Sequence, residues 1–303
     1  MTTSALIDLA SLPVPDALEA LDFETIYAAR KARMIALWPT DEQAEIAATL
    51  ELESEPLARL LQENSYRDLV WRQRVNDAIR AVMLAFAKGA DLEQRAALFG
   101  LERLMISPSD PEHNIDEVHE SDDDLRTRIQ LAPMGFSVAG PADAYRSKAL
   151  AVDGRLLDVR TSRPTPGTVL VSLLSREGDG TAGADLIDAV TAALSADDQR
   201  PLNDTVIVDT AKIVRYRIHA KGYTQSAVGA DVLIAQAVKN VAAYAAMVRR
   251  IKTRIATSAI IGVIQAAGLK RTELIEPAAD IAVDITQASY CIEIVIENGG
   301  TDE

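Results

Sequence analysis

The sequence predicts an α+β protein: an N-terminal helical region with a long helix, followed by two small α/β sandwich-like modules. Apolar residues recur at the helical period of 3.6 through the first hundred residues. After residue 150 they alternate with polar residues at the strand period of two in several short segments. We expect five parts, which are an arm and helix at 1–39, a helical bundle region at 40–106, a linker at 107–120, a central α+β domain at 121–220 and a C-terminal α+β domain at 221–303.

Composition narrows the classes of partner. Of the 303 residues, 48% are hydrophobic and 25% charged, which is typical of a folded, soluble chain. The formal net charge of −14 argues against nucleic acid and against an anionic membrane surface as partners. Cys291 is the single cysteine, so an intrachain disulfide and a four-cysteine zinc site are excluded. We find no signal peptide and no window of about 18 uninterrupted apolar residues.

The N-terminal region begins with an extended arm, because Pro13 and Pro15 oppose a helix. Asp22 is then expected to cap a helix that runs to Trp38 and stops at Pro39. A second helix is expected from Thr40 or Asp41 to about Ser54.

A third helix is predicted over Pro56–Lys88, with Ser54 as a good N-cap and Gly89 as its stop. It would be about 50 Å long at 1.5 Å per residue. That length exceeds the needs of one small core and suggests a bundle shared with other chains. A short helix over Asp91–Phe99 follows.

The clearest linker is Ser107–Pro111, and the acidic stretch Glu117–Asp124 follows it. Beyond this boundary the central module begins with a helix capped by Ser121 and a second helix opened by Gly140–Pro141. The remaining expected elements are strands over Leu156–Thr161 and Val169–Leu173, a helix over Asp185–Leu194, and an alternating stretch Val206–Ile218 with a break near Asp209–Lys212.

The C-terminal module is expected to contain two helices and two strands. The helices cover Asp231–Arg254, which is rich in alanine, and Ser258–Gly268; the strands cover Ile281–Ile285 and Tyr290–Ile296. In the last strand, alternation places Cys291, Glu293 and Glu297 on the face opposite the apolar set. The tail from Asn298 is polar and expected to be loose.

Histidines and acidic residues raise the question of a metal site. His113 and His119 flank Asp116 and Glu117, with Glu120 after them, but the spacing matches no zinc pattern. We favour a solvated acidic linker.

Other candidate features have ordinary structural explanations. His219 ends an alternating strand beside Arg215 and Arg217, and we favour a surface position over a general base. The run Glu177–Gly180 lacks both phosphate-binding glycine patterns and is explained by a tight turn. Trp38 and Trp71 are expected to pack between helices. We predict no catalytic, cofactor-binding or metal-binding residues and no enzyme activity, although the sequence leaves open a paired-carboxylate glycosidase, whose acids need not be close in sequence.

Several motifs resemble the phage baseplate protein J family. They include Asp124–Ile129, the Ser137-x-Ala139-Gly140-Pro141 run with Ala144-Tyr145, Asp153-Gly154-Arg155, Pro166-Gly167-x-Val169, Leu174–Gly180 and Arg200-Pro201-Leu202-x-Asp204. The N-terminal region agrees through Leu12-Pro13-x-Pro15-Asp16, Leu21–Glu24, Arg30–Arg33 and Trp38-Pro39. The similarity covers nearly the whole chain and is strongest over Ser121–Asp204.

This resemblance implies a structural wedge subunit at the baseplate of a contractile tail, in the virion, assembled in the bacterial host cytoplasm. Family members pair with a smaller wedge protein through N-terminal helices. They also contact copies of themselves through C-terminal domains, in a usually six-fold ring around a central hub near the tail tube and sheath. No cofactor is implied. We hypothesise a bistable joint with a hinge near Ser107–Pro111 that takes part in triggering contraction. The alternatives are a tail-associated cell-wall hydrolase and a cytoplasmic scaffolding protein.

Overall fold

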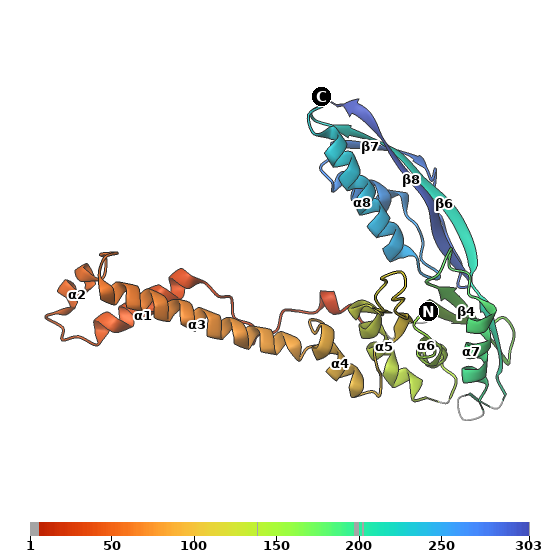
Figure 1. Cartoon of the computed structure of the whole chain (residues 1–303), viewed down its shortest axis with the longest axis horizontal. Coiled ribbons are helices and arrows are strands. Elements are labelled where there is room, and N and C mark those ends of the chain that lie inside the picture. The colour runs from red at the N-terminus through yellow and green to blue at the C-terminus, as the bar shows by residue number, and fades with distance from the viewer. Residues whose placement is uncertain (1–5, 138, 197–199, 202, 303) are drawn as a thin grey trace. The chain divides into compact units, whose positions relative to one another are not determined.

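The computed structural model describes residues 6–137, 139–196, 200–201 and 203–302; Leu202 of the motif around Asp204 lies outside them. The chain divides into two compact units. One, the helical unit, is Ile7–Leu98. The other, the sheet unit, runs from Phe99 to the end of the chain and includes Leu6, which packs against its first core. Together they form the α+β fold predicted from the sequence, with helices first and small sheet modules after them (Figure 1).

The helical unit contains a 3-10 turn and four α-helices among its described residues. Their bounds are η1 Leu9–Ser11, α1 Phe23–Ala36, α2 Gln43–Thr49, α3 Pro56–Ala81 and α4 Gly89–Ala97. The expected cap of α1 is confirmed, since the Asp22 carboxylate accepts a hydrogen bond from the Thr25 main-chain nitrogen at 2.8 Å. The buried Asn76 side chain holds the arm to α3 by pairing with both main-chain groups of Glu19, at 3.1 and 2.9 Å.

The long helix is shorter than predicted. α3 ends at Ala81, so its 26 residues span about 39 Å. After Val82 the chain turns through hydrogen bonds from Met83 to Arg80 and from Phe86 to Met83, and Ala87 is fully buried. Gly89, expected to stop this helix, is instead the first residue of α4.

The N-cap and tryptophan predictions also need correction. Glu55, not Ser54, occupies the N-cap position of α3. Trp71 does not pack between helices of this chain, because it lies 67% exposed. Trp38 is 37% exposed.

The sheet unit begins with a small hairpin and the first sheet module. The hairpin strands are β1 Met105–Ser107 and β2 Val118–His119, within the region predicted as a linker. The module comprises α5 Asp122–Gly135, α6 Ala142–Leu150, β3 Leu156–Ser162, β4 Thr168–Ser175, α7 Ala184–Ser195 and β5 Thr205–Thr210. The strand order is β3-β4-β5, with β3 antiparallel and β5 parallel to β4. Leu131, Tyr145, Leu173 and Leu186 lie in its core.

The second sheet module follows after a single residue. Ala211 separates β5 from β6 Lys212–Thr224, and the Ala211 nitrogen donates a hydrogen bond to Leu173 O at 2.7 Å. The other elements are α8 Ala230–Val248, α9 Thr257–Gln265, β7 Arg271–Glu276 and β8 Gln287–Thr301. In the order β7-β6-β8, β6 runs parallel to β8 and antiparallel to β7. The break predicted near Asp209–Lys212 is present at Ala211, but it is the passage from one sheet to the next and not an irregularity within one domain.

Several predictions for the second module were wrong. β7 was missed, and residues 281–285 form no strand beyond a single bridge between Ile281 and Ile255. The tail expected to be loose continues β8 as far as Thr301. α8 ends at Val248 rather than Arg254, because Arg249 leaves the helical conformation (φ −69°, ψ 72°) and its side chain hydrogen-bonds to the first module.

The predicted assignment of side chains to the two faces of β8 was also wrong for Cys291. The pairing register shifts where Tyr216 opposes Cys291 and Arg217 opposes Glu293, so Ile292 is an extra residue. This bulge exchanges the two faces on its N-terminal side, because one inserted residue reverses the pleat. Cys291 consequently packs against the module's core, whereas Ile292 is 46% exposed.

Helix α8 is long and apolar enough to cross a membrane by length and composition alone, the one such helix among the described residues. In this fold it lies along the second sheet (Figure 1). Its residues Ala237, Val241 and Val248 are buried in the core of that module. Packing of this kind accounts for part of its apolar composition, since other apolar residues, such as Val232 and Met247, remain exposed.

Candidate functional site: an ionic joint between the sheet modules

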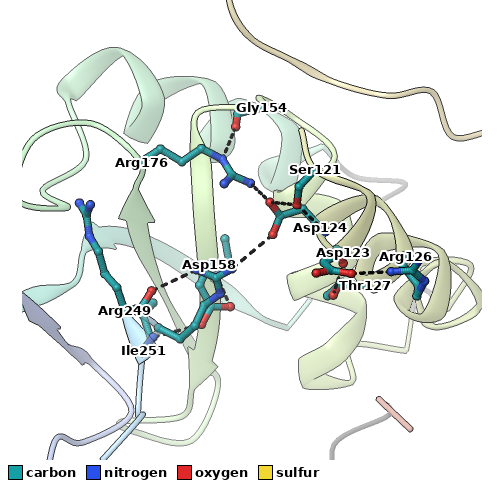
Figure 2. A network of polar contacts seen from close by, with 12 residues as sticks. Ser121, Asp123, Asp124, Arg126, Thr127, Gly154, Asp158, Arg176, Arg249 and Ile251 are labelled. Atoms are coloured by element: carbon teal, nitrogen blue, oxygen red, sulfur yellow. Dashed lines mark hydrogen bonds and ion pairs between the residues drawn. The ribbon is translucent and has the colours of Figure 1, made fainter. Parts of the chain in front are cut away.

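Polar side chains gather where the two sheet modules meet. We call this set the ionic joint, and it consists of Asp124, Arg146, Asp158, Arg176, Arg249, Arg250 and the main chain of Ile251. Figure 2 shows how several of these groups converge. They come from α5, α6, β3 and the end of β4, and from the segment that follows α8.

Asp158 is the buried centre of the joint. Its carboxylate is 2% exposed and accepts hydrogen bonds from Arg146 Nη2 at 2.9 Å and from the main-chain nitrogen of Val159 at 2.9 Å. It also accepts one from the main-chain nitrogen of Ile251, at 3.1 Å, in the second module (Figure 2). A buried carboxylate is tolerable because each of these donors replaces water.

Asp124 makes a second bridge. The Ser121 cap predicted for α5 is confirmed, with the Asp124 nitrogen donating to Ser121 Oγ at 3.2 Å. The Asp124 carboxylate then accepts from Arg176 at 2.8 Å and from Arg250 at 3.3 Å, so it joins both modules. Arg176 also donates from Nε to Gly154 O at 2.9 Å (Figure 2).

Arg249 completes the bridge through the turn after β4. Its Nη2 donates to Gly178 O at 2.9 Å and to Ser175 O at 3.4 Å. Its guanidinium carbon lies 5.0 Å from the ring centre of Tyr290 on β8. Burial lowers the pKa of Arg249. The two carbonyl oxygens and the Tyr290 ring still give its guanidinium group partners.

The turn Glu177–Gly180 is confirmed as a tight turn and takes part in the joint. Gly178 and Gly180 have φ values of +50° and +108°, which favour glycine. Hydrogen bonds from Arg215, first, and then Thr181 lower the pKa of Asp179 to about 2. The Arg215 bond is 2.7 Å long and runs from β6 to the first module.

An apolar contact lies beside these charges. Ile251, Leu174, Ala211 and Ala288 are all buried in one small cluster shared by the two modules. On the side of the second module the joint therefore consists of three successive residues, Arg249 to Ile251, each bonded to the first module. Since Asp124 and Asp158 are both paired with arginines, neither is placed as a free base.

A second feature of the first module is the pair Tyr145 and Asp204. The Tyr145 hydroxyl donates to Asp204 Oδ2 at 2.8 Å beside an open pocket of about 590 Å³. Burial, and then the Asp204 carboxylate, raises the pKa of Tyr145. Gly140, Gly167 and Pro201 also line this pocket, so motif fragments far apart in the sequence meet here.

The acidic stretch before α5 is not a wholly solvated run. Glu120 is 3% exposed, is paired with Arg128 and accepts a hydrogen bond from the Leu104 nitrogen at 3.0 Å. The prediction of a solvated linker was therefore wrong for Glu120, because a buried arginine and a main-chain donor replace its water.

The two histidines of that stretch have separate partners. His113 contacts Asp110 at 2.6 Å, and His119 lies 4.0 Å from Glu117. No group of three or more His, Cys, Asp or Glu side chains is arranged to hold a metal ion within the described part of the chain.

His219 lies on the sheet face away from the helices, as a partly exposed residue of β6. Its Nε2 atom is 2.8 Å from Glu297 Oε1, diagonally across on β8, and Arg217 lies 3.4 Å from Glu293, which directly opposes it. These cross-strand pairs between parallel strands explain the polar face of the sheet.

Sequence reasoning missed the ionic joint. One signal was available, because Asp158 interrupts an otherwise apolar strand, Leu156–Val159, at a position that a buried strand would fill with an apolar residue. The donors Arg249 and Ile251 gave no comparable signal, since the pattern placed them inside a helix.

Comparisons with known proteins place the chain among phage baseplate proteins. The family model described as the Baseplate J-like N-terminal domain matches residues 53–110, and the model of the Baseplate J-like central domain matches residues 137–210. The chain is also 46% identical over 300 residues to baseplate protein J of Escherichia phage P2, with 98% of this chain and 99% of that protein covered.

Proposed function

The chain belongs to the baseplate J-like family, and we propose on this premise that it is a structural wedge subunit of the baseplate of a contractile phage tail. The observation that carries the proposal is the 46% identity to a phage baseplate protein across 98% of the chain. Identity of that extent covers both the helical unit and the sheet unit. The proposed location is the tail baseplate of the virion.

We propose that the helical unit binds another wedge protein through a helical bundle. α3 and its C-cap residue Val82 support this with an apolar stripe that is more than half exposed in the described chain. Leu60, Trp71 and Val82 follow one another at intervals of eleven residues, and Val75 lies beside them. Eleven residues make three turns of about 3.67 residues, so the three share one face. The four side chains are 54%, 67%, 57% and 56% exposed, respectively.

We propose that the sheet unit makes the other contacts of the wedge. Copies of the chain would meet through the C-terminal module, in a six-fold ring around the central hub and close to the tail tube and sheath. The outer face of α8 supports such a contact, because Val232 and Met247 are 71% and 67% exposed. Contraction would be triggered through rearrangement of these interfaces.

Negative-stain imaging of particles from a deletion strain tests the proposal. Loose tubes or tails without a baseplate, restored by the wild-type gene, are the expected result. Normal contractile tails with lost infectivity would contradict it and favour a tail-associated cell-wall hydrolase, which should then clear peptidoglycan as a purified protein.

Complementation with α3 variants tests the bundle separately. Trp71→Glu should fail to restore baseplates, because it places a charge in the centre of the stripe. Tyr66→Glu is the matched control, since Tyr66 is 62% exposed on a different face of the same helix. Equal restoration by the two variants would remove α3 as the partner surface.

A further inference from the structure

A groove of about 470 Å³ opens beside the ionic joint and is not explained by it. Arg146, Arg160 and Lys252 line it, together with Asp143, Thr161 and Thr253. The walls come from α6 and β3 on one side and from the segment after Ile251 on the other. Three cationic side chains therefore face one carboxylate among the described residues that line the groove.

The nearest buried carboxylate cannot satisfy these cations. Asp158 already accepts from Arg146 and from two main-chain nitrogens. Arg160 reaches it only as an ion pair of 3.6 Å, which is too long for a hydrogen bond. Within the described chain, Arg160 Nε and Arg146 Nε and Nη1 are buried and have no hydrogen-bond partner.

This shortage of acceptors has an electrostatic cost. Burial is the main cause that lowers the pKa of Arg160, ahead of the opposing field of Asp158. A guanidinium has donors but no acceptor, so an acceptor oxygen is needed to relieve the cost, and an anion would relieve it most because it also supplies the opposite charge.

Lys252 is held at the groove by an unusual main chain. Its φ of +65° is in the left-handed region, and its nitrogen donates to Gln287 O on β8 at 3.0 Å. Side chains other than glycine adopt this conformation at a cost, which the surrounding structure must offset. The described residues offer its ammonium group no hydrogen bond or ion pair.

We propose that this groove binds an oxyanion, with Arg160 and Lys252 as its two cationic ligands. The planar fork of an arginine matches the two oxygens of a carboxylate or phosphate. Two sources share that chemistry. One is an acidic side chain of a neighbouring protein, which rests on the proposed baseplate function, and the other is a free oxyanion such as inorganic phosphate.

The first experiment uses the purified full-length protein and inorganic phosphate as the probe. The Nε–Hε resonances of ¹⁵N-labelled arginines are followed at constant ionic strength, and Arg160→Gln identifies the Arg160 signal. We expect that signal to shift saturably with phosphate. Lys252→Asn should weaken binding about tenfold, the effect of losing one charge-assisted hydrogen bond. Asn tolerates the left-handed conformation, so this variant should fold even if Arg160→Gln does not.

Arg217→Gln is the control, because Arg217 is paired with Glu293 on the exposed sheet face. It should leave phosphate binding unchanged. An Arg160 signal that does not respond, or a Lys252→Asn protein that binds as tightly as wild type, would overturn the proposal.

Complementation distinguishes the two sources once binding is established. If Lys252→Asn particles lack baseplates, the oxyanion is a carboxylate of a neighbouring protein. If they assemble at the wild-type level, it is a free anion. The resonance experiment does not involve the particle, so its failure would leave the proposed function standing.

Discussion

The main-chain nitrogen of Ile251 donates a hydrogen bond to the buried carboxylate of Asp158, 3.1 Å away and 93 residues earlier in the chain. This bond places the segment after α8 against the first sheet module. The same segment carries Arg249 and Arg250, so a short stretch of chain determines how the two modules meet.

Asp158→Asn should destabilise the sheet unit by about 3–5 kcal/mol, because it leaves Arg146 buried without its counter-charge. Hydrogen exchange at the Ile251 amide is the direct measurement, and we expect it to accelerate. Asp123→Asn is the control, since that side chain is 92% exposed in its pair with Arg126. An unchanged rate at Ile251 in the Asp158 variant would show that the bond is not structurally important.

Gly154→Ala should lower the stability of the folded protein. A β-carbon there would lie 2.2 Å from the main-chain oxygen of Met105, and that oxygen belongs to backbone that must move. Overpacking of this kind costs about 1–3 kcal/mol or more. Gly262→Ala in α9 is the matched control, because no atom of the described residues would lie within 4 Å of the added β-carbon and alanine favours a helix by about 0.5–1 kcal/mol. The unfolding temperature should therefore fall in Gly154→Ala and rise in Gly262→Ala. A shift in the same direction in both variants would contradict the prediction.

The contact between Asp179 and Arg215 should produce an acid-sensitive contribution to stability. The pKa of Asp179 is lowered from 3.8 to about 2, so the folded state binds the proton less readily than the unfolded state. This contribution is present above the unfolded pKa and is lost as the pH falls from about 4 to about 2. Unfolding temperatures of the wild type and Asp179→Asn, measured across this window, should converge at the acid end. A constant difference would refute the assignment.

Tyr145→Phe should reduce stability by about 1.5–3 kcal/mol, the range for a hydrogen bond to a charged group. The ring stays in the core, and only the bond to Asp204 is removed. Tyr66→Phe tests the effect of losing a hydroxyl at a 62% exposed site, where about zero change is expected. Chemical denaturation followed by circular dichroism compares the two. Equal effects would mean that the Asp204 bond contributes nothing.

Local signals predicted much of the fold. The caps at Asp22 and Ser121 are properties of a few adjacent residues, and the structure confirms both. The break between β5 and β6 also followed from the local pattern, whereas the assignment of the two strands to different sheets did not.

The errors arose where distant residues decide the outcome. α8 ends early because Arg249 finds acceptors near Gly178, which no local pattern reveals. Cys291 faces the core because a bulge in the pairing with β6 reverses the pleat. The ionic joint is wholly of this kind, since its two sides are about a hundred residues apart in the chain.

The single residue between β5 and β6 has a mechanical consequence. Ala211 is 1% exposed and bonded to β4, and the strand beyond it pairs with β8 in parallel from Lys212 to Thr224. A connection of one buried residue cannot lengthen without breaking its contacts. A pull on the far end of β8 would load the ladder in shear, with its hydrogen bonds sharing the force, and would reach β4 through Ala211. Force applied to the second module would thus pass directly to the first.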